Sequence, residues 1–515
     1  MNLNFYGHNS FLLQGKNIVV VTDPWLTDKG AFFGSWFQWP INHHLKSKFI
    51  SNIDTHIETC LYISHEHQDH FDKDTLKEIQ PYINFCILPN FDDKFLLNEM
   101  LNLGYKVTEL SDQSKYYFNE KDYLELMIAD AGVIHDSAAI IHIDNKTFVN
   151  QNDCKIFDRL TYIEELDIDF YAVQFSGANW HPVCYQLTDE EKIRISKMKM
   201  FSKQTAVRNA IKMIKPKYYI PSAGPAVFPF LDTSLSLGID NIFVHQPDIS
   251  KFLKNLNIEI AYLRPGENLK KSNLTKPIKP PSPAELRAMK SQLSCDFEKV
   301  RDDEFDVHNL LDEVNKRIEK IEDIKFQECP KLIFDWQDQG LEIDLTQRKA
   351  KVIDFSSYQM PKSYMKVAGS RAYFSLMSNP NYRWEDIYLS LRARVKREPD
   401  VFNTFINIFL CSDPSSIRAG FTTTMDIKDE RIVIVNHVDG KNYEINRYCP
   451  HNGADLKNAK IDNNGNLICP RHSWSFNLEN KGKCESAKAT INAQEIVETI
   501  SLCETISVRM LKNRE

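Results

Sequence analysis

The sequence contains no apolar run that approaches the roughly 20 residues of a membrane-spanning helix. Its N-terminus lacks a basic segment followed by an apolar stretch, so we expect no secretory signal peptide. Cysteine is scarce and scattered, with 11 residues in a chain of 515. These absences argue against an integral membrane protein and against a secreted protein held by disulfides. We therefore expect a cytoplasmic protein in which a few cysteines bind metal and the others are thiols in the core.

Neither sign of charge dominates, because 63 lysines and arginines face 70 aspartates and glutamates, which leaves a net charge of −7. That balance suits neither a nucleic-acid-binding body nor a polybasic surface that docks on membranes, so we expect neither partner. The composition is ordinary for a globular protein, with 42% hydrophobic and 26% charged residues. A single core rarely exceeds about 250–300 residues, so the length predicts two or three domains.

About the first 269 residues predict a layered α/β domain. Residues 138–143 and 147–149 are β-type runs separated by a turn, a pattern that favours a β-hairpin. Thr188 and Glu191 form a capping-box pattern that opens a helix running to about Lys215. Strands followed by helices are typical of packed α/β layers rather than of a helix bundle.

The remainder of the chain divides into three segments. Residues 270–283 are rich in lysine and proline and predict an extended linker. Ser282 and Glu285 form a second capping-box pattern, and the sequence stays helical and charge-rich to about residue 325. Residues 284–418 form a mixed helical and strand-like connecting region whose fold the sequence does not define. Residues 419–515 are rich in β-type runs and predict an all-β domain.

Two cysteine–histidine pairs lie in the C-terminal segment. Cys449-Pro450-His451 is followed, after seventeen residues, by Cys469-Pro470-Arg471-His472. Mixed pairs of this kind suit an iron–sulfur centre in which one iron takes two thiolates and the other takes two imidazoles. A zinc site is the alternative, but its two clusters usually each contain like ligands. The pairs therefore favour an iron–sulfur centre.

These pairs resemble the Rieske ferredoxin family over about residues 419–510. Residues 469–476 are similar to the oxygenase-associated branch, because Ala454 and Arg471 stand where respiratory-chain Rieske proteins carry the cysteines of an extra disulfide. The resemblance implies a β-barrel-like domain that passes electrons to an oxygenase. It also implies a [2Fe-2S] cluster bound by Cys449, His451, Cys469 and His472.

A second cluster, Ser64-His65-Glu66-His67-Gln68-Asp69-His70, directly follows the apolar run 60–63. A strand that leads into a loop dense in imidazoles and carboxylates is how a metal site forms at a sheet edge. His65 and His67 can point the same way, while Asp69 and His70 can turn to a second ion. Two bridged ions form a clamp that activates water or O₂. The alternative is a charged loop that contains histidines by chance.

The His-x-His-x-Asp-His run resembles the metallo-β-lactamase superfamily, and residues 7–13 and 22–26 look like the opening strands of that fold. The resemblance implies an αββα sandwich over residues 1–269, with Asp23 behind the metal ligands. It also implies two metal ions, the first bound by His65, His67 and His135, the second by Asp69 and His70, with Asp153 as the bridge.

The sequence departs from that superfamily at one position. A final histidine normally follows a late strand, but the matching residues 218–225 contain none. The second metal site is therefore one ligand short, open for substrate or O₂, or completed from elsewhere. His181 and His245 are candidates, although each alone reads more readily as a packed or surface histidine. We expect His8 and residues 178–185 to lie around the metals and the pocket.

The presence of both modules in one chain favours iron at the N-terminal site. A zinc hydrolase has no use for an attached electron carrier. The two-His, one-carboxylate signature of ordinary Rieske oxygenases is missing from residues 284–420, where His308 is the only histidine. The CMP-N-acetylneuraminate hydroxylases combine the two modules in the opposite order. The chain is similar to that family at residues 176–185, 221–225 and 389–400.

The sequence thus predicts a monooxygenase that contains a [2Fe-2S] cluster and one or two non-haem irons, with zinc as the alternative. An external ferredoxin, cytochrome b5-like protein or flavin reductase would reduce the cluster, and oxygen from O₂ would enter a small-molecule substrate. A nucleotide sugar or an amino- or amide-containing metabolite fits that role. A zinc hydrolase of lactones or phosphodiesters with a redox-sensing Rieske domain, and an inactive electron-transfer adaptor, remain alternatives, and a homo-oligomer is left open. The basic run of Arg392, Arg394, Lys396 and Arg397 fits a phosphate contact or a solvated face.

Overall fold

The computed structural model describes residues 1–131, 134–269, 276–326, 328–426, 430–451, 453–471, 473–484, 487 and 489–496. It divides into two compact units, Met1–Asp426 and Ile427–Glu515, and each is described by itself. Across the described residues, no helix combines the length and the apolar character needed to cross a membrane. The finer segment boundaries expected at residues 269, 283 and 418 stay predictions.

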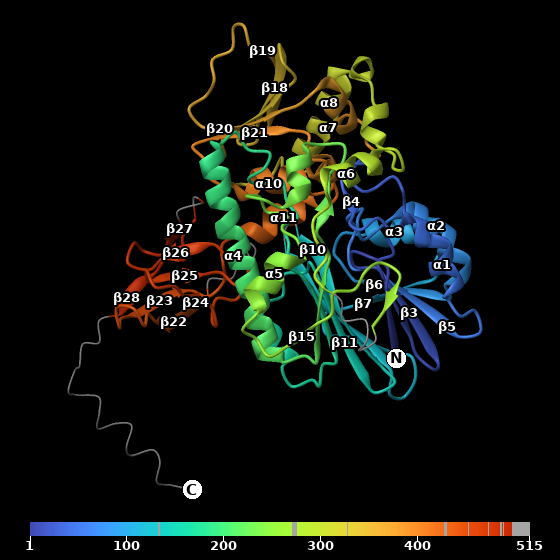
Figure 1. Cartoon of the computed structure of the whole chain (residues 1–515). Helices are drawn as coiled ribbons and strands as arrows, with labels where there is room; N and C mark the ends of the chain where they lie inside the picture. Colours follow the sequence, from blue (N-terminus) through green and yellow to red (C-terminus); the bar gives the residue numbers. More distant parts are fainter. Residues whose placement is uncertain are drawn as a thin grey trace, which may run out of the picture. The chain divides into compact units, whose positions relative to one another are not determined.

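Two seven-stranded sheets form the centre of the first unit (Figure 1). The first contains, in spatial order, β16 (Glu267–Asn268), β1 (Asn2–Phe5), β2 (Phe11–Gln14), β3 (Ile18–Thr22), β5 (Glu58–Tyr62), β6 (Phe85–Pro89) and β7 (Val107–Leu110). The second contains β15 (Glu259–Ile260), β13 (Tyr218–Ser222), β12 (Phe170–Gln174), β11 (Lys146–Asn152), β10 (Ile134–Ile143), β9 (Tyr123–Ala131) and β8 (Lys115–Tyr117). A small two-stranded sheet pairs β4 (Phe37–Gln38) with β14 (Ala226–Val227).

Both faces of these sheets are buried, which produces four layers. Phe11 of the first sheet contacts Phe148 of the second, with ring centroids 5.0 Å apart, so one core lies between the sheets. Along β10, Ile141 belongs to that core and Ile140 to the core on the outer face, as strand alternation requires. The outer faces are covered by α1 (Lys46–Ser51), α2 (Lys73–Ile79), α3 (Phe95–Asn102), α4 (Asp189–Ile214) and α5 (Gln246–Leu253). The predicted αββα sandwich is confirmed.

Local sequence signals account for several of these elements. β10 and β11 form the predicted hairpin, and Asp144 and Asn145 at its turn both have positive φ, 52° and 58°. Two such residues match a two-residue turn whose twist suits a hairpin. The Thr188–Glu191 capping box begins α4 as predicted, and Lys215 ends it in the left-handed conformation.

The connecting region forms a second sheet-and-helix layer system, which lies in the same compact unit as the sandwich. Its five-stranded sheet contains, in spatial order, β19 (Lys349–Asp354), β18 (Gln339–Asp344), β17 (Lys331–Asp335), β20 (Tyr364–Ala368) and β21 (Arg394–Glu398). Its helices are α7 (Val307–Glu319), α8 (Arg371–Met377), α9 (Trp384–Leu389), α10 (Thr404–Cys411) and α11 (Ile417–Met425). The helices pack with the central strands around one core. This region joins the sandwich through backbone bonds. The N–H of Val395 donates to the Cys184 carbonyl and the N–H of Gln186 to the Val395 carbonyl, both at 2.8 Å. These contacts hold β21 against the sandwich.

The helical stretch predicted to run to about residue 325 is interrupted. The capping box at Ser282 begins α6 (Pro283–Lys290), but only short 3₁₀ turns lie between α6 and α7. Their backbone N–H groups are used elsewhere: Ser294 donates to the Asp28 carbonyl and Phe297 to the Phe33 carbonyl, each at 3.0 Å. Tertiary pairing with the loop after β3 therefore replaces helical hydrogen bonds here.

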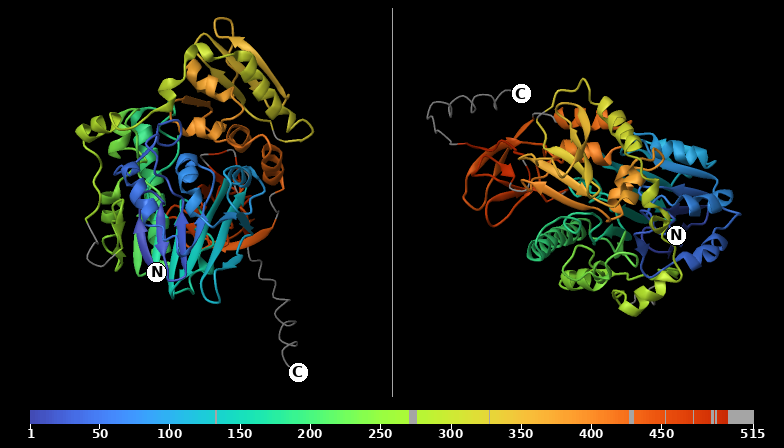
Figure 2. Two further views of the ribbon diagram at one scale, coloured as in Figure 1. Left: turned by 90° about the vertical axis from the view of Figure 1, so that its right-hand side faces the viewer. Right: turned by 90° about the horizontal axis from the view of Figure 1, so that it is seen from above.

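The C-terminal unit is built of strands only over its described residues. One sheet contains β22 (Arg431–Val435), β23 (Asn442–Asn446) and β28 (Gln494–Ile496), and the other contains β24 (Lys460–Ile461), β25 (Asn466–Ile468), β26 (Ser475–Asn477) and β27 (Lys483–Cys484). Figure 2 shows these short strands, in red, from two further directions. Ile445, Leu467 and Phe476 are fully buried inside this unit. The expected all-β character is confirmed.

Candidate metal centres

The histidine-rich loop begins where β5 ends, at the edge of the first sheet. The backbone N–H groups of His70 and Phe71 both donate to the His67 carbonyl, at 2.9 and 2.7 Å. This tight turn brings His70 back over His65, so that their ring centroids lie 4.3 Å apart. The turn therefore makes the histidine side chains of this short loop face one another.

A first group of ligand atoms lies around His65. Its Nε2 is 2.8 Å from Nδ1 of His67 and 4.0 Å from Oδ1 of Asp153, and the same Asp153 oxygen is 3.4 Å from Nε2 of His70. One ligand atom from each of His65, His70 and Asp153 fits within 4.8 Å of the others. The structure therefore brings the loop histidines together with the aspartate that follows β11.

A second group of ligand atoms shares His70. Nε2 of His8 lies 3.1 Å from Oδ2 of Asp69 and 3.2 Å from Nε2 of His70. All three side chains are buried, and their ligand atoms lie within 4.8 Å of one another. The two groups therefore meet at His70.

The donor set fits a divalent transition metal. Imidazole nitrogens and carboxylate oxygens suit iron and zinc alike. Oδ1 of Asp153 is buried and has no hydrogen-bond donor among the described residues, although it lies beside two imidazoles. A buried carboxylate oxygen without a donor is costly unless a cation compensates it. This orphaned oxygen is the observation that favours a metal ion here.

The electrostatics of the site also favour positive charge. Burial lowers the pKa of His65, but Asp136 and Asp153 outweigh it and raise the pKa to about 9. Burial likewise lowers the pKa of His67, and Glu385 raises it to about 9. The carboxylates thus stabilise a cation on the imidazoles, whether a proton or a metal ion, and metal binding releases protons.

Asp23 lies directly behind the loop, as the resemblance implies. Its Oδ2 is 2.7 Å from Nδ1 of His70 and accepts a hydrogen bond from Oγ of Ser64 at 2.6 Å. Asp23 is fully buried. Holding Nδ1 leaves Nε2 of His70 directed at both groups of ligand atoms, which is how a carboxylate orients a metal-binding histidine.

Two acidic residues at the site were missed from the sequence. Oδ1 of Asp136 lies 3.3 Å from Nδ1 of His65, and Oε2 of Glu385, on α9, lies 3.4 Å from Nε2 of His67. Asp136 could have been predicted from the sequence, because it directly follows the candidate ligand His135. Glu385 has no local signal, because only the packing of the connecting region brings it to the loop.

His135 lies on β10, beside Asp136. Its ring packs against Phe91, with centroids 5.7 Å apart. Among the described residues, neither group of ligand atoms within 4.8 Å includes it. Its role as a metal ligand therefore stays a prediction.

The two histidines considered as substitutes for the missing final ligand have contacts elsewhere. The ring of His181 meets Tyr185 at 4.6 Å between centroids, and burial lowers the pKa of His181 to about 2. His245 directly precedes α5, and its Nε2 lies 2.8 Å from the Ser236 carbonyl. Neither belongs to the two groups of ligand atoms found among the described residues.

The two Cys–Pro loops of the C-terminal unit share the same backbone hydrogen bonds around their cysteines. Cys449 donates to the Ala454 carbonyl at 2.9 Å, and Cys469 donates to the Trp474 carbonyl at 2.8 Å. In each loop the fourth residue after the cysteine, Gly453 or Ser473, donates back to the cysteine carbonyl at 2.9 Å. Those two residues also have nearly equal positive φ, 62° and 60°. The backbone hydrogen bonds around Cys449 and Cys469 are thus equivalent.

The residues predicted to bind the cluster differ in exposure in the way that suits an iron–sulfur site of mixed ligands. Cys449 and Cys469 are each only 1% exposed, whereas His451 is half-buried. The His451 ring stacks on Trp474, with centroids 4.3 Å apart and planes 7° apart. His472 lies outside the described residues. Buried thiolates and a more accessible imidazole suit a centre that exchanges electrons through its histidine side.

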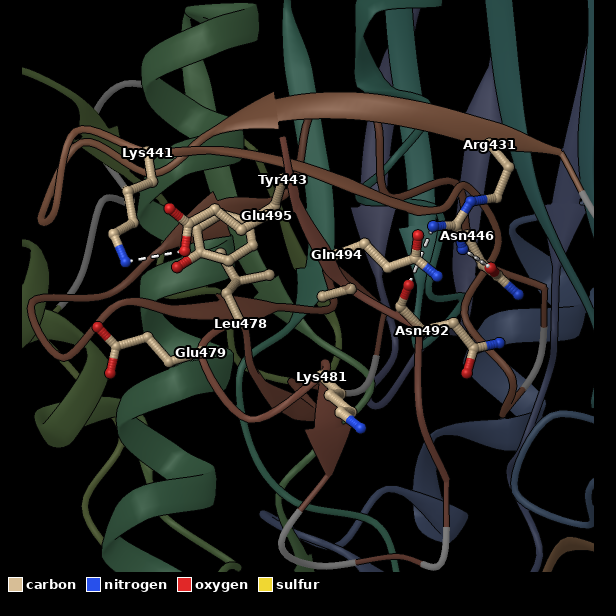
Figure 3. Close-up of a pocket in the computed structure, with 11 residues that line it drawn as sticks. Arg431, Lys441, Tyr443, Asn446, Leu478, Glu479, Lys481, Asn492, Gln494 and Glu495 are labelled. Carbon is tan, nitrogen blue, oxygen red and sulfur yellow. Dashed lines mark hydrogen bonds and ion pairs between the residues drawn. The ribbon is translucent and has the colours of Figure 1, made fainter. Parts of the chain in front are cut away.

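An open pocket in the C-terminal unit lies over β23 and β28 (Figure 3). Its lining is mostly polar and internally paired: Nζ of Lys441 lies 2.9 Å from Oε2 of Glu495, and Arg431 donates to the Asn492 carbonyl at 3.0 Å. The lining residues do not include Cys449 or Cys469. We therefore do not assign the chemistry of the protein to this pocket.

Comparison with family models identifies both modules. Residues 2–146 match the beta-lactamase superfamily domain, and residues 407–500 match the Rieske [2Fe-2S] domain. The chain carries a β-lactamase-fold domain and a C-terminal Rieske domain. The Rieske domain supports a [2Fe-2S] cluster, and the β-lactamase fold supports a metal ion.

Relatives with known descriptions cover most of the chain. A Rieske 2Fe-2S iron-sulfur protein of Mycolicibacterium smegmatis is 28% identical, over 95% of this chain and 98% of its own length. The cytidine monophosphate-N-acetylneuraminic acid hydroxylase of Asterias rubens is 20% identical, over 78% of this chain and 64% of its own length. Among solved structures, the metallo-beta-lactamase fold protein YhfI from Bacillus subtilis aligns with a TM-score of 0.34 and 12% identity, over 52% of this chain and 95% of its own.

Proposed function

We propose that this chain is an iron-dependent monooxygenase in which the β-lactamase-fold site carries the chemistry and the Rieske domain delivers electrons to it. The observation that carries the proposal is the buried imidazole and carboxylate cluster at the end of β5, in a chain that also contains a Rieske domain. A metal that stays at one oxidation state, such as zinc, could not accept the electrons that a Rieske domain carries. The similarity to a hydroxylase is consistent with this choice.

The residues proposed to hold iron are the imidazoles and carboxylates at the end of β5 and after β11, with His135 as a further candidate. Iron bound there supplies the reduction of O₂ and the insertion of one oxygen atom into a C–H or N–H bond. The overall reaction consumes O₂, two electrons and two protons, and it releases one water. The proposed metal ligands are His65, His67, Asp69, His70, His135 and Asp153.

The surrounding residues have separate tasks in this proposal. Asp23 fixes His70 by accepting from its Nδ1, and Glu385 fixes His67 through its Nε2. Arg383 holds Glu385 in turn, with 3.3 Å between Nη2 and Oε2. Such outer contacts keep ligand side chains in one orientation and typically change metal affinity about 10–100-fold when removed.

Electrons reach the iron from outside the chain through the proposed cluster. The ligands proposed for the [2Fe-2S] cluster are Cys449, His451, Cys469 and His472. The half-buried His451 offers the accessible side of that cluster. We propose a small redox protein or reductase as donor, in the class of ferredoxin, cytochrome b5-like protein or flavin reductase.

Two lysines of α4 favour a substrate that carries negative charge. Lys199 and Lys203 lie one turn apart on α4, and neither forms an ion pair with an acid among the described residues. Burial, and then Lys155, lower the pKa of both to about 7, while Asp153 and Asp136 act on Lys203 in the opposite direction. A phosphate or carboxylate of the substrate would supply the missing counter-charge. We therefore propose an anionic metabolite, with a nucleotide sugar as one fitting class.

Metal analysis of the purified chain tests the proposed function. We expect iron in excess of the two atoms of the Rieske cluster, and His65→Ala should lower that excess while the visible spectrum of the cluster stays unchanged. Anaerobic reduction followed by O₂ should then oxidise two iron populations together, as seen by Mössbauer spectroscopy. A fully active preparation that holds zinc and no iron beyond the cluster would establish the hydrolase alternative instead.

A further inference from the structure

The loop between β1 and β2 has a constrained backbone. The N–H of Tyr6 donates to the Ser10 carbonyl and the N–H of Ser10 to the Gly7 carbonyl, both at 2.8 Å. Within this turn Gly7 and His8 both have positive φ, 110° and 51°. The left-handed region is costly for a residue with a side chain, and such residues concentrate at functional sites. The histidine is therefore held in a conformation that a turn alone would leave to glycine or asparagine.

This conformation directs the His8 imidazole inward. His8 is only 3% exposed, and its ring meets Trp25 edge to face, with centroids 5.2 Å apart. Nδ1 is buried and has no hydrogen-bond partner among the described residues. Nε2, on the other side of the ring, faces Oδ2 of Asp69 and Nε2 of His70. Two imidazole nitrogens and a carboxylate oxygen thus converge in a buried place.

The same loop lies beside the segment from which the superfamily's final histidine is missing. The N–H of Ala223, directly after β13, donates to the His8 carbonyl at 2.8 Å. Ser222, the last residue of β13, is fully buried, and its Oγ has no partner among the described residues. The neighbouring loop therefore brings an imidazole close to the position at which the chain lacks one.

We propose that His8 is a ligand of a second divalent metal ion, together with Asp69 and His70, and that it replaces the missing histidine. The inference rests on the proposed metal centre. Three protein ligands with a further open position are the usual arrangement of a catalytic metal. Asp153, whose Oδ1 is 3.4 Å from Nε2 of His70, connects this ion to the first group of ligands. The centre is then dinuclear.

The competing role for His8 is a hydrogen bond to Asp69 without metal contact. Burial raises the pKa of Asp69, but His8 outweighs it and holds that pKa well below its usual range. A hydrogen-bonding role needs only a donor at this position, so glutamine would largely replace the histidine. A ligand role needs the imidazole itself, because a neutral amide is a much weaker ligand for iron or zinc. The two roles therefore predict different metal contents for His8→Gln.

The experiment measures metal per full-length chain by mass spectrometry, with the Rieske cluster quantified separately from its visible absorption. We expect two ions beyond the cluster in the unaltered protein and one in both His8→Ala and His8→Gln, with the cluster unchanged. His245→Ala is the matched control, because His245 is also buried but lies at the start of α5, and it should keep two ions. Thermal unfolding checks that each variant is folded.

The outcomes separate this inference from the proposed function. Two ions in both folded His8 variants, or two ions in His8→Gln alone, would overturn the ligand role. One ion in the unaltered protein and one in His8→Ala would overturn it as well, while an iron oxygenase with a single metal would survive. If both ions are zinc and His8→Ala loses one, the inference stands and the oxygenase proposal fails.

Discussion

Oε2 of Glu385 lies 3.4 Å from Nε2 of His67, so the connecting region supplies an acidic group to the histidine-rich loop of the sandwich. The contact crosses from α9 of the connecting region to the loop after β5 of the sandwich, and both lie in the same compact unit. A second contact runs alongside it, because Nε2 of Gln68 donates to Oδ2 of Asp386 at 3.0 Å. The connecting region is therefore part of the site and more than a spacer between modules.

Removing the Glu385 carboxylate should weaken metal binding without removing a ligand. We expect Glu385→Ala to lower metal affinity at the N-terminal site about 10–100-fold, because His67 loses the group that orients it. Glu385→Gln should lose less, since an amide oxygen still accepts a hydrogen bond. Competition with a chromophoric chelator measures the affinity. Glu319→Ala, on an exposed position of α7, is the control, and an equal loss in it would refute the assignment.

Arg383 is the buried cation that holds these acids together. Its Nη2 lies 2.9 Å from Oε1 of Glu66, and its Nε lies 3.1 Å from Oδ2 of Asp413. Removing one partner from a buried ion-pair network leaves charges uncompensated and typically costs about 3–5 kcal/mol. We expect that loss for Arg383→Met in the free energy of unfolding, measured by urea denaturation.

The matched control for Arg383 is an exposed arginine in a similar pair. Arg418 contacts Asp323 at 2.6 Å, but both side chains are more than half exposed. An exposed pair typically contributes about 0–1 kcal/mol, so Arg418→Met should have little effect. Similar losses in the two variants would show that Arg383 is no more important than a surface charge.

The parts of the site that the sequence predicted are those encoded within a few residues. The His-x-His-x-Asp-His loop and the two Cys–Pro pairs keep their proposed ligands close in the chain, so spacing alone was enough to predict metal chemistry there. The capping boxes at Thr188 and Ser282 are equally local, and both helices begin there. Local hydrogen bonding decides such features, and tertiary packing does not override it.

The parts that the sequence did not predict depend on contacts between distant segments. Glu385 lies in a short helix whose other residues are all buried, and nothing in its neighbours marks it as a partner of His67. His8 was expected near the metals, but its approach to Asp69 depends on the strained turn at Gly7. The interrupted helix before α7 has the same cause, because pairing with Phe33 competes with the local helical signal.

The Rieske ligands can be tested with two buried cysteines of one unit. Cys449 is a proposed ligand, whereas Cys484 ends β27, away from the two Cys–Pro loops in sequence. We expect Cys449→Ser to abolish the visible absorption and the low-temperature electron paramagnetic resonance signal of the reduced cluster. Cys484→Ser should retain both, since it replaces one small buried side chain by another. Retention of the cluster signal in Cys449→Ser would remove this residue from the ligand set.

The half-buried lysines of α4 should make stability depend on pH. Burial, and then Lys155, lower the pKa of Lys203 to about 7, against an unfolded value near 10.4. Between these values the unfolded chain binds the proton and the folded chain does not, so stability rises with pH across about pH 7–10 and is lowest below pH 7. Lys203→Met should therefore raise the melting temperature most at pH 6 and least at pH 10. Lys212→Met, at an exposed position of the same helix, should shift it little at either pH. A Lys203→Met shift that does not depend on pH would show that Lys203 remains charged in the folded protein, which would fit a permanent anionic partner.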